Sequence, residues 1–497
     1  MNRLLGLTPK NGNRSGDTMP MYHDGKWHIF VSDPPNGKWL FPGSAAVSTF
    51  HIVSKDLIHW EQVECNDLHP GKKGSYDQDG LWTGCVIEKD GTFHYFYTGG
   101  VRTSKGYEQK ICHATSTDMI NWKKNPNNPI LGPDDRYDQI DFRDPQIHMD
   151  EEGNYVMLVA TRDPLGPSFK SGIIAAAYSK DLINWKLGDA FASQHLTHCP
   201  ECPEYFKLGD YYYLVYSRYS EFMQTFYRVS KNPNGPWESR KSDTLDGRRF
   251  YAGKSCTDGE RRIAFAWIPY RLDHLANERW VWGGDLGSPH EYVSLDDGTL
   301  TVKLPEEVSN SYTNSHKFEI KNSFNKWSFN SNNIINTEAI STYSSCFLKG
   351  PKREDDMLFE TNIKINEGTS AAGILLESSN DLFRSYYLSI EPLKSRVMLN
   401  RWPLTSDPQW NDLVIKGRHK FFDNIFEEDY PLVDRILPEL PKNNLFNVKI
   451  TRKGTNVECW ICDQVVASYR IYEEAENMFG LFVQEGSASF HNLEWRT

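Results

Sequence analysis

Three acidic residues recur at nearly one position relative to predicted hairpin turns. Asp17, Asp144 and Glu201 each lie eight or nine residues before the glycine of such a turn. A single acid at a strand end is commonly an ordinary turn residue, but three in register indicate a shared site. Hydrolysis of a glycosidic bond needs one ionised carboxylate and one carboxyl group that burial and a neighbouring negative charge keep protonated. The three acids therefore favour glycoside hydrolysis.

The segment "THCPECPEYF", residues 197–206, surrounds Glu201 with two cysteines at C-x-x-C spacing. A structural zinc site needs four ligands, and the second C-x-x-C, residues 459–462, lies in a predicted strand of a different domain. A thioredoxin-like redox site needs a βαβ context that this sequence lacks. We therefore predict no metal and no redox role: Glu201 is the working group, and Cys202 packs beside it. No cofactor is implied, because acid/base work on a glycoside needs none.

A heptapeptide repeat indicates how the acids are brought together. "SKDLIHW", "STDMINW" and "SKDLINW" begin at residues 54, 116 and 179, and a degenerate copy, "SKNPNGPW", begins at residue 230. Self-similarity at such a period suggests a stacked or radial array. We expect the Ser and Asp of each copy to tie a turn and the Trp to fill the space between repeats, with no chemical role.

Five turn signals, each followed by an alternating aromatic run, interleave with this repeat. They are "HDGKWHIFV", "KDGTFHYFYTGG", "EEGNYVMLVA", "LGDYYYLVYS" and "GERRIAFAWI". Asp-Gly turns suit hairpins, and the runs suit strands. Five small antiparallel sheets in sequence predict a five-bladed β-propeller over residues 1–305. The first strand of each blade lines the channel of a propeller, so the three acids should converge on one axial pocket.

The composition changes after "TVKLPEEV", where residues 306–340 are rich in Asn and Ser. We place a domain boundary near 305–315. Residues 315–497 alternate again between strands and turns, which predicts a C-terminal β-sandwich. Between those strands, residues 421–444 are expected to form a loop with a helical turn. The predicted fold class is all-β, a five-bladed β-propeller followed by a C-terminal β-sandwich.

Charge and composition exclude several classes of partner. The 497 residues carry a formal net charge of −11, which argues against a nucleic-acid partner. No run of about 18 apolar residues could span a membrane, and the N-terminal segment lacks the apolar stretch of a signal peptide. Nine scattered cysteines fit reduced thiols. We therefore expect a cytoplasmic protein, with no membrane partner, that acts on a small-molecule or oligosaccharide substrate.

Four further residues are candidates for substrate binding. Arg143 in "DFRDP" adjoins Asp144. Trp82 in "DGLWTGC" could stack on the C–H face of a sugar, or it could be a core residue. Asp79 in the same stretch could bind hydroxyl groups or cap the turn. Trp282 in "WGGD" falls where the fifth blade should close, and it could line the pocket.

The motifs together resemble glycoside hydrolase family 32, the β-fructofuranosidase, levanase and inulinase group, which shares a wider clan pattern with family 43. The matching stretches are "FHIVSKDLIHWE", "YDQDGLWTGCVIEKDGTFHYFYTG", "DFRDP" and "ECP". The resemblance implies a retaining β-fructofuranosidase in which Asp17 is the nucleophile, Asp144 the transition-state stabiliser held by Arg143, and Glu201 the general acid/base. It also implies sucrose, a fructo-oligosaccharide or a fructan as substrate, with or without fructosyl transfer.

The stretch around Asp17 departs from the family pattern Trp-Met-Asn-Asp-Pro-Asn-Gly. Here it reads "RSGDTMPMYHDGKWHIF", and a lookalike, "SDPPNG", follows at residues 32–37. We interpret Asp33 in that lookalike as a loop residue. Two other readings remain open: an inverting pentofuranosidase or xylosidase of the family-43 type, and a non-catalytic carbohydrate-binding propeller.

Overall fold

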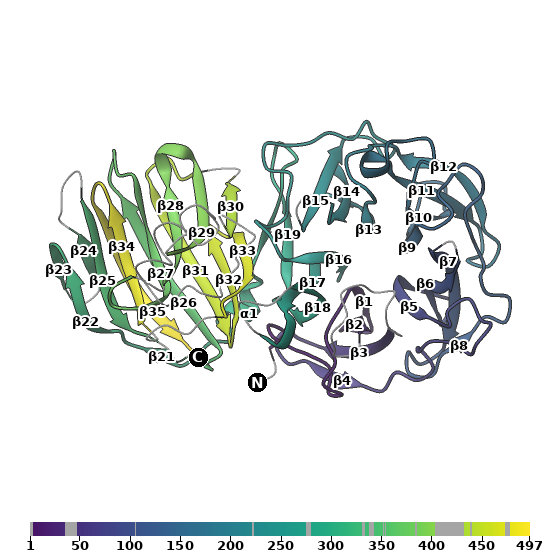
Figure 1. Ribbon diagram of the computed structural model, residues 1–497, viewed down its shortest axis with the longest axis horizontal. Helices are drawn as coiled ribbons and strands as arrows, with labels where there is room; N and C mark the ends of the chain where they lie inside the picture. The colour runs from purple at the N-terminus through teal and green to yellow at the C-terminus, as the bar shows by residue number, and fades with distance from the viewer. Residues whose placement is uncertain are drawn as a thin grey trace. The chain divides into compact units, whose positions relative to one another are not determined.

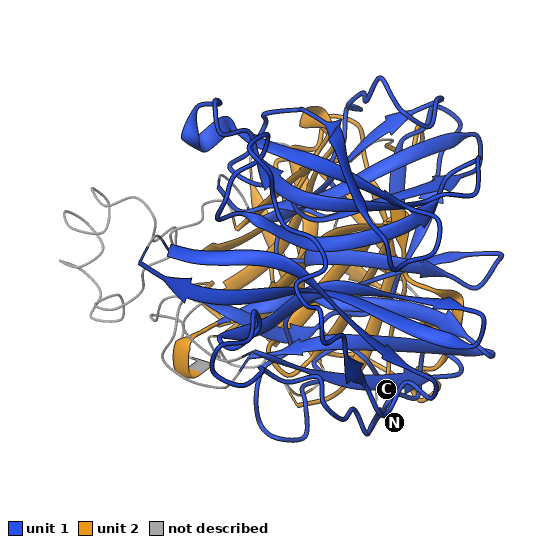
Figure 2. Cartoon of the chain, turned by 90° about the vertical axis from the view of Figure 1, so that its right-hand side faces the viewer, with its two compact units in different colours: residues 1–270, 281–301 blue, residues 271–280, 302–497 orange. Residues whose placement is uncertain are grey.

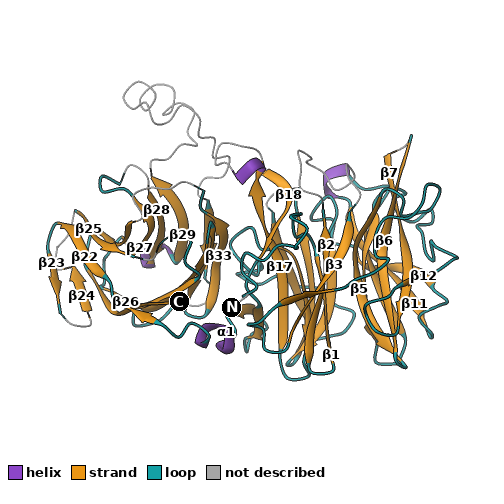
Figure 3. Ribbon diagram, turned by 90° about the horizontal axis from the view of Figure 1, so that it is seen from below, coloured by secondary structure: helices purple, strands orange, loops and turns teal. Residues whose placement is uncertain are grey.

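The computed structural model describes residues 3–34, 47–104, 106–220, 223–274, 280–330, 333–336, 342–350, 352, 354–382, 385–402, 432–437, 440–472 and 478–497. Contacts divide the chain into two compact units, residues 1–270 with 281–301 and residues 271–280 with 302–497 (Figure 2). Almost all regular structure is β-strand (Figure 3). Within the described residues, no helix is long and apolar enough to cross a membrane.

The first unit is built from five antiparallel sheets, so the predicted five-bladed β-propeller is confirmed (Figure 1). Blades one and two contain β1 (Thr18–His23), β2 (Lys26–Asp33), β3 (Ser48–Ser54), β4 (Glu61–Val63), β5 (Gly80–Lys89), β6 (Thr92–Thr103), β7 (Gly106–Ser116) and β8 (Lys123–Lys124). Blades three and four contain β9 (Phe142–Met149), β10 (Tyr155–Arg162), β11 (Gly172–Ser179), β12 (Lys186–Ala192), β13 (Glu201–Leu208), β14 (Tyr211–Arg218) and β15 (Gln224–Ser230). Blade five contains β16 (Tyr251–Thr257), β17 (Arg262–Arg271), β18 (Trp280–Leu286), β19 (His290–Ser294) and β20 (Leu300–Lys303).

The first strands of the five blades form a closed ring around the channel. Strand β1 contacts β5, β5 contacts β9, β9 contacts β13, β13 contacts β16, and β16 returns to β1. The N-terminal segment helps to close the ring, because Ser15 and Gly284 exchange two backbone hydrogen bonds of 2.8 Å. A side chain at Gly284 would meet the carbonyl oxygen of Ile268 at 1.9 Å. The closure therefore requires glycine in the "WGGD" stretch.

The heptapeptide turns pack neighbouring blades together, as predicted. In the first copy, Asp56 accepts hydrogen bonds from the hydroxyl group of Ser54 and from two backbone N–H groups. The tryptophan of each copy meets an aromatic ring of the preceding blade around the ring: Trp60 with Phe265 at 5.7 Å, Trp122 with Phe30 at 5.5 Å, and Trp185 with Phe96 at 5.6 Å. The repeat thus sets the spacing between blades and contributes no group to the channel.

The second unit is a sandwich of two antiparallel sheets, which confirms the predicted C-terminal fold. One sheet has the order β23-β24-β35-β26-β31-β32-β33 with β21 on β35, and the other has the order β22-β25-β34-β27-β28-β29-β30. The bounds are β21 (Ser315–His316), β22 (Glu319–Phe324), β23 (Trp327–Phe329), β24 (Asn333–Asn336), β25 (Tyr343–Lys349), β26 (Met357–Ile365), β27 (Ala371–Ser378), β28 (Ser385–Glu391), β29 (Arg396–Trp402), β30 (Val433–Ile436), β31 (Leu445–Lys453), β32 (Asn456–Ile461), β33 (Gln464–Arg470), β34 (Met478–Gln484) and β35 (Ala488–Arg496). A large apolar core lies between them.

Within the described residues, helical structure is confined to short pieces. Helix α1 (Glu306–Asn310) follows the last propeller strand, and the 3₁₀ turns described cover Ser168–Lys170, Leu272–His274 and Pro392–Lys394. The first part of the predicted loop at 421–444, up to residue 431, lies outside the described residues. Its later part includes strand β30, because the chain there pairs with β29.

Candidate active site

The three predicted acids converge at one end of the channel. Asp17 directly precedes β1, Asp144 is the third residue of β9, and Glu201 opens β13. The sulfur atom of Cys202 lies 3.8 Å from Oδ2 of Asp17 and 3.8 Å from Oδ2 of Asp144, so it links the two carboxylates. Asp17 and Asp144 are 8% and 3% exposed, whereas the side chain of Glu201 is 24% exposed. Two acids are therefore buried, and the third reaches toward solvent. The place where the three carboxyl groups meet is the acid well.

A β-bulge interrupts the first strand of blades two to five and lies at Asp144 and next to Glu201, whereas Asp17 directly precedes the regular strand β1 of blade one. The pairing with the second strand slips by one residue in β5, β9, β13 and β16. At the bulges Asp144, Cys202 and Ala252 have left-handed φ angles of 59°, 51° and 55°. Such a conformation costs a non-glycine residue about 1–3 kcal/mol and is concentrated at functional sites. A bulge bends its strand and re-aims a side chain, which here turns the chain toward the channel.

The register of the bulges corrects the alignment of the acids by one residue. Arg143, Glu201 and Tyr251 are the last paired residues before the bulges of blades three, four and five. Glu201 is therefore equivalent to Arg143, and Asp144 is equivalent to Cys202. Counting back from the hairpin glycines placed Asp144 opposite Glu201. That count is one residue off, because the hairpin loop of blade three is longer than that of blade four.

Asp17 is held by two donors from other blades. The hydroxyl group of Thr83, the bulge residue of β5, donates to Oδ2, and the indole N–H of Trp267 donates to Oδ1 at 2.7 Å. Both carboxylate oxygens are thus oriented by side chains that lie far away in the sequence. Burial and the nearby charge of Asp144 raise the pKa of Asp17 to about 6.

Asp144 is fixed mainly by backbone groups. Its Oδ2 atom accepts the N–H of Cys202 at 3.0 Å, and its own N–H donates to the hydroxyl oxygen of Thr98 at 2.8 Å. The nearest Arg143 nitrogen is 3.7 Å away, so Arg143 is not its closest support, contrary to the expectation from the sequence. Burial raises the pKa of Asp144 above its usual value, and Arg143 opposes that effect.

Arg143 instead supports Glu201. Its Nη2 atom lies 3.0 Å from Glu201 Oε1, and its Nη1 atom donates to Asp141 and, at 3.2 Å, to Gln109. The hydroxyl group of Tyr251 donates to the other oxygen of Glu201. Burial raises the pKa of Glu201 to about 7, with Arg143 opposing and Asp144 reinforcing the shift. A raised pKa at Glu201 suits a group that must hold a proton until it donates it.

The remaining predicted residues lie around this cluster with different functions. Trp282 packs 5.8 Å from the ring of Trp267, the tryptophan that binds Asp17. The ring of Trp82 stacks on Tyr107 at 4.6 Å, so one of its faces is already covered. Asp79 accepts the backbone N–H of Arg102 at 2.8 Å, which favours the turn-capping alternative.

Asp33 was expected in a loop, and this expectation is wrong. It is the last residue of β2 and pairs with Ser48, because the two strands stay extended to that point. Its carboxylate accepts a hydrogen bond of 2.8 Å from Asn11. The rest of the lookalike stretch, residues 35–37, lies outside the described residues.

The sequence reasoning missed Thr83, Trp267 and Tyr251. Tyr251 was detectable, because "FYAGK" in blade five occupies the place of "FRDPQ" in blade three and "ECPE" in blade four. Trp267 pairs with Tyr251 across the same sheet. Thr83 had no separate signal, since its contact with Asp17 crosses 66 positions of sequence.

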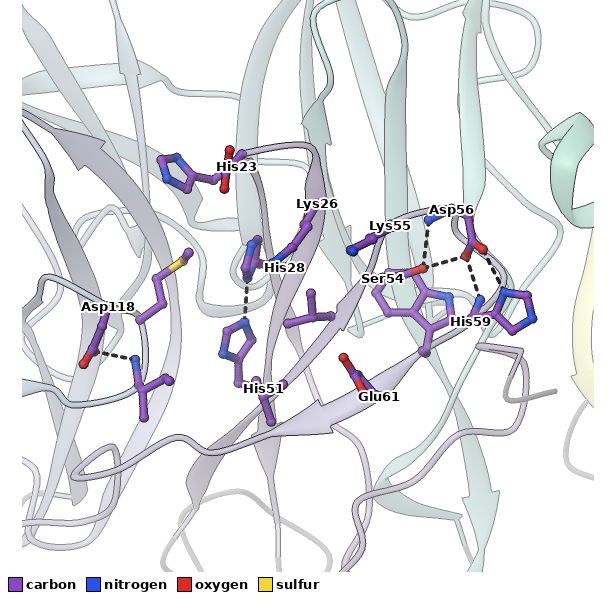
Figure 4. Close-up of a pocket in the computed structure, with 16 residues that line it drawn as sticks. His23, Lys26, His28, His51, Ser54, Lys55, Asp56, His59, Glu61 and Asp118 are labelled. Atoms are coloured by element: carbon purple, nitrogen blue, oxygen red, sulfur yellow. Dashed lines mark hydrogen bonds and ion pairs between the residues drawn. The ribbon is translucent and has the colours of Figure 1, made fainter.

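A histidine-rich groove lies outside the acid cluster. In the described part of the chain, no group of three or more His, Cys, Asp or Glu residues is placed to hold a metal ion. A groove of about 850 Å³ along blade one contains the contact between His28 and His51, 3.0 Å apart (Figure 4). None of the three acids lines this groove. The chemistry of the acids therefore belongs to the channel.

The sequence matches known proteins mainly through the propeller. The Glycosyl hydrolases family 32 N-terminal domain matches residues 7–300. Raffinose invertase of Escherichia coli is 28% identical over 326 residues, which cover 61% of this chain and 65% of the relative. Sucrose-6-phosphate hydrolase of Zymomonas mobilis subsp. mobilis is 26% identical over 324 residues, covering 60% and 61%. The chain thus spans less than two thirds of the length of these curated relatives.

The fold has a counterpart along almost its whole length. The crystal structure of fructan 1-exohydrolase IIa from Cichorium intybus superposes with a TM-score of 0.70, covering 99% of this chain and 97% of that chain at 18% identity. At that identity the likeness shows a common fold. The family match, in contrast, takes in more than half of the chain and confirms the resemblance seen in the motifs. The chain belongs to glycosyl hydrolases family 32.

Proposed function

We propose that the protein cleaves β-fructofuranosides by a retaining double displacement. The observation that carries the proposal is the convergence of Asp17, Asp144 and Glu201 on one well, where burial raises the pKa of Glu201 to about 7. Family membership and the fructose-containing substrates in the names of the matched relatives support the choice of sugar. Substrates to test are sucrose, raffinose, sucrose 6-phosphate, inulin and levan.

In the first step, ionised Asp17 attacks the anomeric carbon while Glu201 protonates the departing oxygen. A bond forms between an Asp17 oxygen and the sugar, the glycosidic C–O bond breaks, and the leaving group departs as a neutral alcohol. Trp267 and Thr83 hold the carboxylate of Asp17 in place. Loss of the proton leaves Glu201 as a carboxylate beside Arg143 and Tyr251, which stabilise its charge.

In the second step, the Glu201 carboxylate accepts a proton from water, and the water oxygen attacks the anomeric carbon. Asp17 leaves, and the configuration of the sugar is retained after two inversions. A sugar hydroxyl in place of water would give fructosyl transfer by the same route. Analysis of the products at high substrate concentration separates the two outcomes.

Asp144 has the geometry of a sugar-binding and charge-stabilising group. Its Oδ2 atom is occupied by the N–H of Cys202, while Oδ1 has no hydrogen-bond partner within the described ranges. An ionised Oδ1 can accept from substrate hydroxyl groups. It also lies where positive charge develops on the sugar in the oxocarbenium-like transition state.

The test compares wild-type protein with Asp17→Asn on the fructoside panel. We expect turnover by the wild type with the β-anomer of fructose formed first, as followed by NMR, and no turnover by the variant. The control is Asp33→Asn, which changes the acid of the lookalike stretch and should leave turnover intact. Initial formation of the α-anomer would replace the retaining mechanism with an inverting one, and a wild type inert on every fructoside would remove the proposed function.

A further inference from the structure

Beneath the acid well lies a buried lysine that the mechanism above does not use. Lys254 follows the bulge of β16 in blade five and is 3% exposed. Its ammonium group donates to the carbonyl oxygen of Gly84 at 2.7 Å and points to that of Pro145 at 3.4 Å. These carbonyls belong to β5 and β9, at or next to their bulges. One side chain therefore joins the bulged backbone of three blades.

The ammonium group has no carboxylate within ion-pair distance in the described residues, although it is buried. Burial of an unpaired charge is costly, and such a charge persists where polar groups compensate it. The two carbonyl dipoles provide part of that compensation. The remaining positive field acts on the acids of the well: Lys254 lowers the pKa values of both Asp17 and Asp144.

Lys254 also lies between a cavity and the acid well. It lines a cavity of about 1080 Å³ together with Gly84, Glu204 and Arg262, whereas none of Asp17, Asp144 and Glu201 lines that cavity. Glu204 on the cavity side is paired with Arg262 at 3.3 Å and with Ser255. Lys254 thus stands between the Glu204–Arg262 ion pair and the acids of the well.

We propose that Lys254 is a positioning residue of the active site, which ties the bulges of blades two, three and five together and supplies the buried positive charge that keeps Asp17 and Asp144 ionised. This inference rests on the proposed function for its catalytic meaning. Without Lys254, less positive charge would offset the repulsion between the carboxylates of Asp17 and Asp144. The pKa of Asp17, the proposed nucleophile, would then rise, and a larger fraction of it would be protonated. The titratable groups that face Asp17 are Asp144 on β9, Glu201 and Cys202 on β13, and Tyr251 and Lys254 on β16.

The first test is a thermal melt of wild type and Lys254→Met at pH 5 and pH 8, and it requires no substrate. An acid whose folded pKa is raised lowers stability as pH increases from its unfolded pKa to its folded pKa. Loss of Lys254 raises those folded values further, so the loss of stability extends to higher pH. We expect the Tm deficit of Lys254→Met to be clearly larger at pH 8 than at pH 5. An equal deficit at both pH values would reduce Lys254 to packing and overturn the proposal.

The second test is the pH dependence of kcat/KM on a cleaved fructoside. Lys254→Met should move the acidic limb of the kcat/KM profile to higher pH. We expect kcat/KM to be roughly tenfold lower than that of the wild type at pH 5, with a smaller loss at pH 7. The reason is that a rise of one unit in pKa lowers the ionised fraction about tenfold at a pH below the pKa. Lys254→Arg, which keeps the charge, should restore the position of the limb even if its Tm is lower. A limb that stays at the wild-type position in Lys254→Met would contradict the proposal.

Controls keep the two conclusions separate. Arg228→Met removes a buried cation of blade four that pairs with Asp243 at 2.9 Å, and its Tm deficit should not grow from pH 5 to pH 8. If Lys254→Met does not fold, both measurements are made on Lys254→Gln, because glutamine keeps N–H donors for the two carbonyl oxygens but carries no charge. A wild type inactive on all fructosides would end the proposed function, while the melts would still decide whether Lys254 supports the ionised acids.

Discussion

Two sets of aspartates in the propeller show opposite behaviour. In the heptapeptide turns, Asp56, Asp118 and Asp181 each accept two backbone N–H groups and a side-chain donor. In the channel, Asp17 and Asp144 accept fewer backbone bonds and are buried beside each other. The pKa values of the first set are lowered by their hydrogen bonds, most clearly in Asp118 and Asp181, and those of the second set are raised by burial.

The comparison teaches that residue type does not decide the function of an acid in this fold. A carboxylate at a partly exposed turn is saturated with donors and stays ionised, so it stabilises the blade. A carboxylate in the channel is shielded from solvent and has too few hydrogen-bond donors to replace the lost water, so its pKa rises. Different features produce that difference for the two acids: Asp144 stands at the bulge of β9, whereas Asp17, which precedes β1, is enclosed by Thr83 and Trp267 from other blades.

Exchange of one acid in each region gives the largest expected contrast. Asp17→Asn removes the proposed nucleophile, and we expect kcat on a fructoside to fall by roughly 10⁴-fold or more. Asp118→Asn changes an acid of the turn set and should keep wild-type kcat. Both rates are measured by release of reducing sugar. Comparable losses in the two variants would remove the distinction between channel and turn acids.

The acid/base residue gives the next largest effect and sharpens the comparison within the channel. With the pKa of Asp17 at about 6 and that of Glu201 at about 7, kcat/KM should rise with pH as Asp17 ionises and fall as Glu201 loses its proton. If Glu201 is the proposed acid/base residue, Glu201→Gln should lower kcat by about 10²- to 10⁴-fold and abolish the basic limb. A basic limb that persists in this variant would assign the proton donor to another group.

Tyr251 offers a smaller change in the same limb. Its hydroxyl group donates to Glu201 and lowers the pKa of that residue. Tyr251→Phe should therefore move the basic limb of the kcat/KM profile to higher pH and lower kcat by about tenfold. An unshifted limb with an unchanged rate would show that the hydroxyl group has no effect on the proton of Glu201.

The smallest expected effect lies in the turn set and concerns stability. Asp118→Ala should lower Tm at pH 7 by a few degrees, because the backbone N–H groups of the turn lose their acceptor. The folded pKa of Asp118 is lowered, so its contribution is present above the unfolded pKa near 4 and is lost as pH falls below it. The Tm difference from wild type should shrink below pH 4, and a constant difference down to pH 3 would contradict the charge-based explanation.

Local patterns in the sequence predicted the architecture and the membership of the site. Hairpin turns, alternating strands and the heptapeptide are encoded within a few neighbouring residues, and strand and turn formation depend on such short-range features. They were sufficient for the five blades, for the sandwich, and for the choice of Asp17, Asp144 and Glu201 as the acids that meet.

The partners of those acids depended on the tertiary structure. Arg143 was expected to hold Asp144 but binds Glu201 more closely, because a bulge displaces the register by one residue. Trp267 reaches Asp17 across 250 positions of sequence, and Lys254 reaches Gly84 across 170. The amino-acid sequence by itself determined that acidic side chains occupy the inner strands. Only closure of the ring of blades decided which donor, cation or neighbouring acid faces each one, because such contacts join strands that share no local pattern.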